Sequence, residues 1–276
     1  MTNISGTTRL LSVIGHPIHH SLSPVIHSRF AAECGVNLVC LAFEVKPHEL
    51  RGFTAAAGLL SMVGFSVTMP LKEAVIPYLD DLDDSAKVYS SVNTVAIRDG
   101  KLRGYNTDAH GFITPLGSIG FTADRGTALI LGTGGAARTS AAALLDCGMD
   151  VKMASRRHNE LTPFRDGVSY CAWDDIEQHA KSARILVNAT PLGMTGSAHD
   201  YTDFGFLDAL PKASPVYDLI YVPSQTALLK QAKAKGHPTL NGLSFLIHQA
   251  ARSFYIYTGK APSEKVIKAL HHELTV

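Results

Sequence analysis

The sequence predicts an α/β protein with two domains, and three observations support this prediction. Apolar stretches with the length of buried strands alternate with segments of helical pattern along most of the 276 residues. Near the middle of the chain, a glycine-rich turn follows one such stretch and precedes an alanine-rich helix, and a separate α/β alternation comes before it. The length suffices for two ordinary domains, each with a hydrophobic core.

The N-terminal part begins with three strands and two helices. In chain order they cover Leu10–Gly15, the helix Ser23–Cys34, Asn37–Val45, the helix Pro47–Ala57, and Val63–Val67. The first helix starts with serine and proline, which suits an N-cap followed by the first helical residue.

A β-hairpin and a helix complete this part. The hairpin strands cover Val92–Ile97 and Lys101–Tyr105, and Asp99-Gly100 between them is a typical hairpin turn. A helix over Asp108–Ile119 then leads toward the glycine-rich turn.

The glycine-rich turn has the pattern of a dinucleotide-binding site. Ala128–Leu131 is a buried strand by composition, Gly132, Gly134 and Ala137 match G-x-G-x-x-G/A, and a helix is predicted to run to Cys147. The first glycine permits a tight turn, the second lets the backbone approach a pyrophosphate, and the small third residue lets helix and strand pack closely. The free N–H groups of the helix N-terminus then face the anion.

The next strand indicates which dinucleotide binds. Val151–Ser155 is followed by Arg156 and Arg157. Arg156 lies 24 residues beyond Gly132, close to the roughly 20 at which NAD-binding folds place an acid on the ribose 2′-hydroxyl. No acid stands between Val151 and Asn159. Because a guanidinium pairs well with a phosphate, the arginines favour NADP over NAD. The alternative is that they only solvate the end of the strand.

The remaining elements define the predicted domains. They are strands at Val168–Ala172, Ile185–Asn188 and Val216–Leu219, a helix at Ser224–Lys235 capped by Ser224, and a final helix at Leu243–Tyr257. We expect residues 1–107 and 239–276 to form an α/β substrate-binding and catalytic domain completed by the C-terminal helices. Residues 108–238 are expected to form a Rossmann-type NADP-binding domain. The active site is expected in the cleft between the two, because open α/β sheets bind ligands beyond the carboxyl ends of their strands.

The composition is that of a soluble globular protein. A net charge of +1 argues against nucleic acid or an anionic membrane as the main partner. We expect a cytoplasmic protein, because no apolar run suits a transmembrane helix and the N-terminus lacks a signal-peptide pattern.

The four cysteines form no C-x-x-C pair, which is typical of buried free thiols. No metal is expected, since the 13 histidines lack partners at metal-ligand spacing. The oligomeric state stays open, a homodimer included.

Three polar segments, the third made of two stretches, lie at predicted strand ends of the N-terminal part. HPIHHSLSP (16–24) places Ser21 and Ser23 before a helix, where two hydroxyls and free N–H groups suit a carboxylate. Capping of the helix by Ser23 alone is the alternative. SVTMPLK (66–72) places Thr68 and Lys72 across a proline turn. VNT (92–94) and YNTD (105–108) add Asn93, Asn106, Thr107 and Asp108.

A lysine and an aspartate that face one cleft can handle a proton together. The carboxylate orients the amine, and the amine exchanges a proton with a substrate oxygen. Taken singly, Lys72 fits a surface lysine and Asp108 fits a helix cap, so the candidate site depends on their pairing.

Over nearly its whole length the chain resembles the shikimate dehydrogenase family. The segments that carry the resemblance recur in the family's order and approximate spacing. They are HSLSP (20–24), VTMPLK (67–72), VNT (92–94), GYNTD (104–108), GTGGAAR (132–138), NATPLGM (188–194), YDLIY (217–221) and NGLSFLIHQA (241–250). The resemblance implies reversible, NADP-dependent interconversion of 3-dehydroshikimate and shikimate in aromatic amino-acid biosynthesis.

The resemblance also implies roles for individual residues. Lys72 and Asp108 would be the catalytic pair, and Ser21 and Ser23 would hold the substrate carboxylate. The substrate hydroxyls or ring would be bound by Thr68, Asn93, Tyr221 and Gln249. The residues implied for the cofactor are Gly132, Gly134, Gly135 and Ala136 at the pyrophosphate, Arg156 at the 2′-phosphate, and Asn188, Thr190 and Gly242 along its adenosine or nicotinamide side.

Two positions bear on specificity. Relatives that also oxidise quinate tend to carry threonine at the position of Ser23, so serine favours shikimate. Ser155-Arg156-Arg157 replaces the family's common N-R-T/S, and we expect preference for NADP rather than exclusivity. Two other functions stay open: a quinate/shikimate dehydrogenase with relaxed substrate or NAD use, and a non-catalytic sensor of shikimate-like acids.

Overall fold

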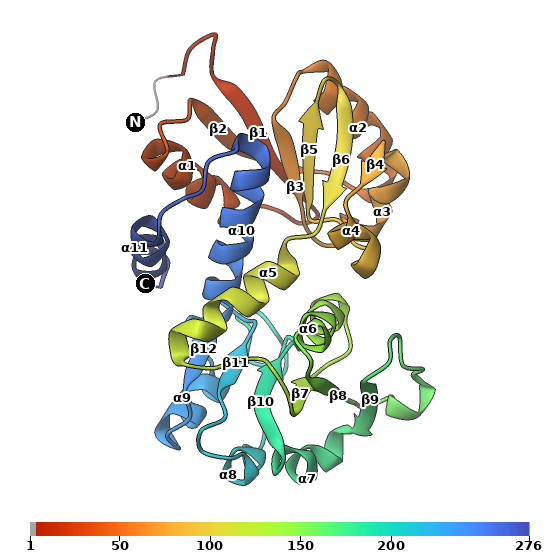
Figure 1. Cartoon of the computed structure of the whole chain (residues 1–276), viewed down its shortest axis with the longest axis vertical. Helices are drawn as coiled ribbons and strands as arrows, with labels where there is room; N and C mark the ends of the chain where they lie inside the picture. The colour runs from red at the N-terminus through yellow and green to blue at the C-terminus, as the bar shows by residue number, and fades with distance from the viewer. Residues whose placement is uncertain (1–3, 276) are drawn as a thin grey trace. The chain divides into compact units, whose positions relative to one another are not determined.

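The computed structural model describes residues 4–275, which form two units with one six-stranded sheet each (Figure 1). The first unit contains residues 4–108 and 247–273, and the second contains Ala109–Leu246. Helices and strands alternate in both, so the predicted two-domain α/β class is confirmed.

The first sheet has the strand order β2-β1-β3-β5-β6-β4. β1 (Arg9–Gly15) lies parallel to both β2 (Leu38–Glu44) and β3 (Gly64–Val67). β5 (Thr94–Arg98) runs antiparallel to β3 and forms the predicted hairpin with β6 (Lys101–Tyr105). The hairpin turn has positive φ at Asp99 (50°) and Gly100 (75°), as a type I′ turn requires. A two-residue strand, β4 (Asp81–Leu82), pairs with β6.

Helices pack on both faces of the first sheet. Phe65 and Val67 of β3 face a core formed with α2 (Leu50–Leu59), α3 (Leu71–Ala74) and α4 (Asp84–Tyr89). Successive strand residues point to opposite faces, so Ser66 points the other way and bonds Tyr257 of α10 (Gly242–Thr258) at 3.0 Å. The remaining elements of this unit are α1 (Ser23–Glu33), α11 (Glu264–Leu274) and the short 3₁₀ helices Pro47–Glu49 and Ile76–Tyr78.

His27 of α1 lies in an aromatic cluster on the α10 side. Its ring centroid is 6.2 Å from those of Phe30 and Phe254 and 5.9 Å from that of Tyr257. The imidazole is 1% exposed, and its Nδ1 has no hydrogen-bond partner. Burial lowers the pKa of His27 to about 4, so the folded protein holds the ring neutral.

We expect His27 to make the first unit sensitive to acid. The unfolded chain binds a proton there below about pH 6.5, and the folded chain only below about pH 4. Stability from this site is therefore fully present above pH 6.5 and is lost as the pH falls, by about 3 kcal/mol at pH 4. Urea unfolding at several pH values should show a steeper loss for the native chain than for His27→Phe, whereas replacement of the exposed His48 by Gln leaves the loss unchanged. Parallel curves for the native chain and His27→Phe would contradict this assignment.

The second sheet is entirely parallel, with the order β12-β11-β10-β7-β8-β9. This is the doubly wound order of dinucleotide-binding folds, with the first strand of the unit at the centre. Ligands of such sheets bind where the strand order reverses, which is here between β7 and β10. The strands are β7 (Thr127–Leu131), β8 (Asp150–Ser155), β9 (Val168–Ala172), β10 (Ala183–Asn188), β11 (Val216–Asp218) and β12 (Thr239–Asn241).

Both faces of the second sheet are buried, which explains the uninterrupted apolar run of β7. Ala128 and Ile130 pack on one side with α6 (Gly135–Asp146), and Leu129 and Leu131 pack on the other. Helices on that other side are α7 (Ile176–Ala180), α8 (Phe206–Ala209) and α9 (Ala227–Ala234). The further helical segments are α5 (Asp108–Ile113) and the 3₁₀ helices Thr114–Ile119, His158–Glu160 and Trp173–Asp175.

Several helix caps, starts or lengths differ from the prediction, and the helix predicted over Pro47–Ala57 is α-helical only from Leu50. Leu22 rather than Ser23 is the N-cap of α1, and no side chain caps that helix. The helix predicted from Ser224 begins at Ala227, where Thr226 is the N-cap and accepts from Leu229 N at 3.3 Å. The helix predicted over Asp108–Ile119 is α-helical only to Ile113, because Pro115 lacks the N–H that an α-helix would use.

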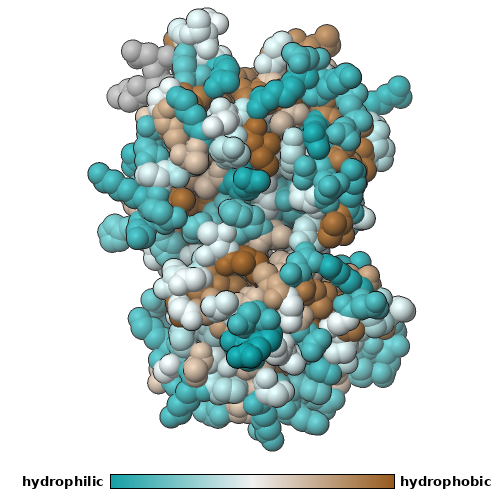
Figure 2. All heavy atoms as spheres, viewed as in Figure 1, coloured by the Kyte–Doolittle hydropathy of each residue, from teal (hydrophilic) through white to brown (hydrophobic). Residues whose placement is uncertain are grey.

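Hydrophilic side chains cover most of the visible face of each unit (Figure 2). No helix within residues 4–275 is long and apolar enough to cross a membrane.

All four cysteines are free; Cys40 and Cys171 are buried, but Cys34 and Cys147 are only half-buried, so the prediction of buried thiols is wrong for these two.

Candidate active site

Four strand ends meet at one edge of the first sheet. β1 and β3 end there, the antiparallel β5 begins there, and β6 returns to it. The connecting loops are joined by backbone hydrogen bonds: His16 N donates to Met69 O (3.2 Å), and Val92 N donates to Lys72 O (2.9 Å). This topology brings together the three polar segments that are far apart in the sequence.

Lys72 and Asp108 form an ion pair at this edge. Lys72 Nζ lies 2.5 Å from Asp108 Oδ2. The aspartate side chain is 7% exposed and the lysine side chain 32%, so the carboxylate is held inside while the amine remains accessible. Asp108 N donates to Asn106 Oδ1 (2.9 Å), which fixes the first residue of α5. The pairing on which the candidate site depends is therefore present.

Asn93 engages the second oxygen of the Asp108 carboxylate. Its Nδ2 lies 2.7 Å from Asp108 Oδ1, 2.9 Å from Thr107 Oγ1 and 3.4 Å from Gln249 Oε1 of α10. Its Oδ1 accepts from Thr107 N (2.9 Å) and Thr94 Oγ1 (2.9 Å). A buried network whose members are all hydrogen-bonded holds a single geometry. The carboxylate thus presents one oxygen to Asn93 and the other to Lys72.

The two serines lie in the loop between β1 and α1. Because Ser23 does not cap α1, the alternative that it serves only as a cap is wrong. Ser21 Oγ accepts from Ser23 N at 3.3 Å, and Ser23 is 7% exposed. Thr68 lies close to the start of this loop: a Cβ at Gly15 would come within 2.5 Å of Thr68 Cγ2. Three hydroxyl groups therefore lie at or beside the loop that precedes α1.

Glu44 at the end of β2 holds this loop as well. It pairs with His16 Nδ1 at 2.7 Å and with His19 Nε2 at 2.9 Å. Glu44 lies far from both histidines along the chain, and the parallel pairing of β1 and β2 brings it to them, so no local sequence pattern connects these residues. Among the described residues, no group of three histidine, cysteine, aspartate or glutamate side chains could hold a metal ion.

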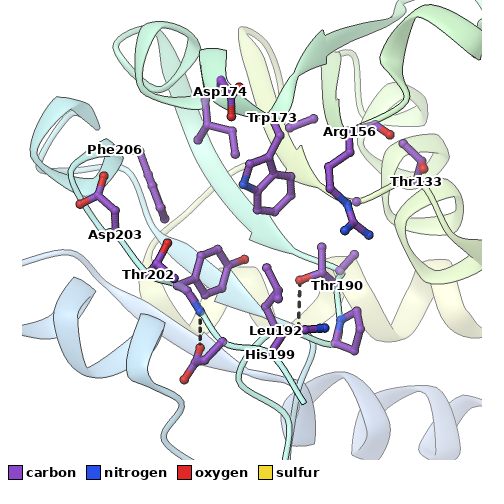
Figure 3. Close-up of a pocket in the computed structure, with 18 of the residues that line it drawn as sticks. Thr133, Arg156, Trp173, Asp174, Thr190, Leu192, His199, Thr202, Asp203 and Phe206 are labelled. Atoms are coloured by element: carbon purple, nitrogen blue, oxygen red, sulfur yellow. Dashed lines mark hydrogen bonds between the residues drawn. The ribbon is translucent and has the colours of Figure 1, made fainter. Parts of the chain in front are cut away.

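A cavity of about 1080 Å³ lies in the second unit, at the carboxyl ends of β7, β8, β9 and β10 (Figure 3). The glycine-rich turn, the end of β8, the 3₁₀ helix after β9 and the long loop after β10 form its walls. This is the position expected for the ligand of a doubly wound sheet.

The glycine-rich turn borders this cavity through Gly132 and Gly134. Gly132 has a φ of +107°, and a Cβ there would lie 3.0 Å from Thr190 Cγ2 and 3.1 Å from Ala189 O. A Cβ at Gly134 or Gly135 would contact nothing within 4 Å. Gly134 is the N-cap of α6, so open space lies in front of free helix N–H groups, as an anion site requires. Gly135 and the exposed Ala136 follow in the first turn of α6 and do not line the cavity itself.

Arg156 and Arg157 line the cavity at the end of β8 and are exposed. Within residues 4–275, neither guanidinium forms an ion pair. Two unpaired cations that line the same cavity as the N-terminus of α6 suit a ligand with phosphate groups at two places.

Asn188 lies behind the cavity wall rather than in it. It is fully buried, and its Oδ1 accepts from Thr190 N (3.0 Å), Thr190 Oγ1 (2.7 Å) and Tyr201 Oη (2.9 Å). Its Nδ2 donates to Asp218 Oδ1 (2.9 Å), and Thr226 Oγ1 donates to Asp218 Oδ2 (2.6 Å). Burial raises the pKa of Asp218 to about 6, and the donated hydrogen bonds oppose this rise. Asn188 therefore positions Thr190, which does line the cavity.

Tyr221 and Gly242 lie in the second unit, after β11 and β12 respectively. Tyr221 is half-buried, and burial raises the pKa of its hydroxyl. Gly242 N donates to Ile220 O at 3.0 Å. A Cβ at Gly242 would collide with the carbonyl of Leu219 and lie 3.1 Å from Ile220 C. Gly242 thus permits a close approach of two backbone segments, for which a glycine is required.

We expect two glycine substitutions to differ in effect, one lowering the stability of the fold and the other weakening ligand binding. Gly242→Ala should lower the free energy of unfolding by about 1–3 kcal/mol or more, because the colliding atoms are backbone and cannot rotate away. Gly134→Ala should leave stability nearly unchanged, since its Cβ meets open space, and should weaken binding of a phosphate-containing ligand at α6. Chemical denaturation and ligand titration of both variants check this. Equal stability of the two would contradict the close-approach argument.

One part of the cavity wall was not predicted from the sequence. Trp173, Tyr201 and Phe206 line it, together with Asp174 and Asp203. Trp173 and Asp174 belong to the 3₁₀ helix after β9, Tyr201 and Asp203 lie in the loop between β10 and α8, and Phe206 is the first residue of α8. The one signal available was the position of Trp173 directly after a predicted strand.

Two family models match the chain. The model described as "Shikimate dehydrogenase substrate binding domain" matches residues 13–95. The model described as "Shikimate 5'-dehydrogenase C-terminal domain" matches residues 242–270. Of the candidate residues at the sheet edge, Ser21, Ser23, Thr68, Lys72 and Asn93 fall in the first match and Gln249 in the second.

Individual relatives match most of the chain. The shikimate dehydrogenase (NADP(+)) of Oleidesulfovibrio alaskensis is 41% identical over 257 residues, covering 91% of this chain and 90% of its own. The crystal structure of the Listeria monocytogenes shikimate 5-dehydrogenase in complex with shikimate and NAD has a TM-score of 0.87 at 30% identity, covering 98% of this chain and 99% of its own. That of the Thermus thermophilus shikimate 5-dehydrogenase in complex with NADP(H) and shikimate has a TM-score of 0.84 at 31% identity, with 97% and 100% covered.

Proposed function

The chain belongs to the shikimate dehydrogenase family, and from this premise we propose that it catalyses the reversible, NADP-dependent interconversion of 3-dehydroshikimate and shikimate. The observation that carries the proposal is the ion pair of Lys72 with a nearly buried Asp108, held from the other side by Asn93. An accessible ammonium on a fixed carboxylate is what proton exchange with a substrate oxygen requires.

We assign substrate binding to the first unit. The loop before α1 offers the hydroxyls of Ser21 and Ser23 to the substrate carboxylate. Thr68, Asn93 and Gln249, at the same sheet edge or within reach of it, are assigned to its hydroxyl groups. Tyr221 of the second unit is assigned to the substrate on the family resemblance alone.

Lys72 handles the proton of the reaction in this proposal. When the ketone is reduced, the Lys72 ammonium donates a proton to the oxygen that develops negative charge, and in oxidation the amine takes the proton back. Asp108 stabilises the ammonium and fixes its position, because one carboxylate oxygen is held by Asn93 while the other contacts Nζ.

We assign NADP(H) to the cavity of the second unit, where the residues present fit it. When bound, the cofactor would supply hydride transfer to or from the substrate carbon. The open space before Gly134 and the N-terminus of α6 suit a pyrophosphate. The unpaired Arg156 suits the 2′-phosphate, Thr190 contributes to the wall, and Asn188 acts through Thr190.

Product analysis tests the proposal directly. The purified protein is incubated with shikimate and NADP, and the products are identified by mass spectrometry. We expect 3-dehydroshikimate, two hydrogens lighter than shikimate, in equal amount to the NADPH formed. Saturable binding of shikimate without any product would favour the non-catalytic sensor instead.

A further inference from the structure

The single tryptophan of the chain stands in the wall of the cofactor cavity. Trp173 is the first residue after β9 and begins the short 3₁₀ helix Trp173–Asp175. Figure 3 shows its indole ring directed into the cavity, which the side chains of Arg156 and Thr190 also line. A large flat apolar surface therefore borders the place where an unpaired guanidinium is exposed.

The indole stacks with a neighbouring tyrosine that also lines the cavity. The rings of Trp173 and Tyr201 are nearly parallel, with centroids 6.3 Å apart and an interplanar angle of 21°. Tyr201 is held by the hydrogen bond from its hydroxyl to Asn188 Oδ1 (2.9 Å), and Asn188 is held by Asp218. Burial raises the pKa of Tyr201, so its hydroxyl keeps the proton that it donates. This chain of contacts ends on the sheet and orients the indole.

We propose that Trp173 is the surface on which the adenine ring of the cofactor stacks. The inference rests on the proposed function, which places NADP(H) in this cavity. Adenine and the 2′-phosphate are attached to neighbouring carbons of one ribose, so a phosphate bound at Arg156 brings the base to the adjoining wall. Every purine base has a flat face that can stack on an aromatic ring, and Trp173 presents such a ring in the cavity that Arg156 also lines.

Intrinsic fluorescence reports on this contact without any turnover. Because Trp173 is the sole tryptophan, emission excited at the indole band arises from this site. Titration with 2′,5′-ADP, which carries adenine and the 2′-phosphate but no nicotinamide, should quench or shift the emission saturably. Nicotinamide mononucleotide, which lacks adenine, should leave it unchanged at the same concentrations.

Three variants distinguish the loss of an aromatic stacking surface from the loss of side-chain volume. Trp173→Leu keeps an apolar side chain and should weaken binding of 2′,5′-ADP, measured by calorimetry, by about tenfold or more. Trp173→Phe keeps an aromatic face and should lose only part of the affinity. Phe164→Ala removes an aromatic ring that does not line the cavity and should bind as the native chain does. Circular dichroism confirms that each variant is folded.

The outcomes distinguish this inference from the function on which it rests. If 2′,5′-ADP binds the native chain but neither alters the emission nor loses affinity in Trp173→Leu, the stacking assignment is overturned and the function stands. If neither NADP nor 2′,5′-ADP binds the native chain, the cofactor assignment fails, and the role of Trp173 fails with it.

Discussion

Replacing Lys72 with alanine is expected to lower kcat for shikimate oxidation by about 10²–10⁴-fold, with a much smaller change in KM. This is the usual contribution of a positioned acid or base, and it is made mainly in the transition state. Within residues 4–275, Lys72 is the cation that pairs with Asp108, through Oδ2, and the second oxygen of that carboxylate is already bonded to Asn93, so we expect no other group to replace Nζ. Initial rates at saturating shikimate and NADP measure the effect.

A matched surface variant controls for the loss of a lysine. Lys87 pairs with Asp84 on α4 and is 57% exposed, so Lys87→Ala should have native kinetics. The Lys72→Ala protein should also bind shikimate with an affinity close to that of the native chain. If Lys72→Ala retained most of its turnover, the assignment of the proton to this lysine would be wrong.

Replacing Arg156 with leucine is expected to raise KM for NADP by about 10–100-fold and to leave KM for NAD nearly unchanged. A hydrogen bond to a charged group contributes about 1.5–3 kcal/mol, and only NADP carries the phosphate that would receive it. The guanidinium has no ion-pair partner among residues 4–275, so its removal leaves no buried charge behind. Kinetics with each cofactor at saturating shikimate check this prediction.

The control for Arg156 is another exposed arginine of the same unit. Arg125 lies outside the cavity, and Arg125→Leu should keep the native preference between the cofactors. Arg157→Leu should have an effect smaller than that of Arg156→Leu. Equal losses with NADP and NAD after replacement of Arg156 would show that this side chain supports the cavity rather than selecting the 2′-phosphate.

Long elements with a strong pattern were predictable from the sequence. The apolar run of β7 and the spacing of Gly132 and Gly134 determined a strand, a turn and a helix, because each feature depends on neighbouring residues alone. The hairpin at Asp99-Gly100 was predictable for the same reason, since positive φ at two adjacent residues favours this pair.

Helix starts were less predictable, because tertiary contacts decide them. Thr226 rather than Ser224 caps α9. Thr226 also donates a hydrogen bond to Asp218, the buried last residue of β11. Two-residue β4 and the three-residue β12 carry too little pattern to be recognised, although both pair within their sheets. Pro115, in contrast, was a visible signal that the predicted helix over Asp108–Ile119 could not remain α-helical.

The contacts of the candidate site also divide into those that could be predicted from the sequence and those that could not. The meeting of Thr68, Lys72, Asn93 and Asp108 could be anticipated, because each follows or precedes a strand at one sheet edge. The wall formed by Trp173 and Tyr201 could not, since it joins two loops whose proximity depends on the order of β9, β8, β7 and β10. The contact of Glu44 with two histidines depends in the same way on the pairing of β1 with β2.

The most direct test of the central claim is a four-way initial-rate assay of shikimate or quinate with NADP or NAD, followed by reduced-nicotinamide absorbance. We predict that shikimate with NADP exceeds the alternatives on each axis by tenfold or more in kcat/KM, a difference of about 1.4 kcal/mol per axis. Comparable rates with quinate or NAD would contradict the roles of Ser23 and Arg156 in specificity. No turnover with any pair would contradict the proposed dehydrogenase activity.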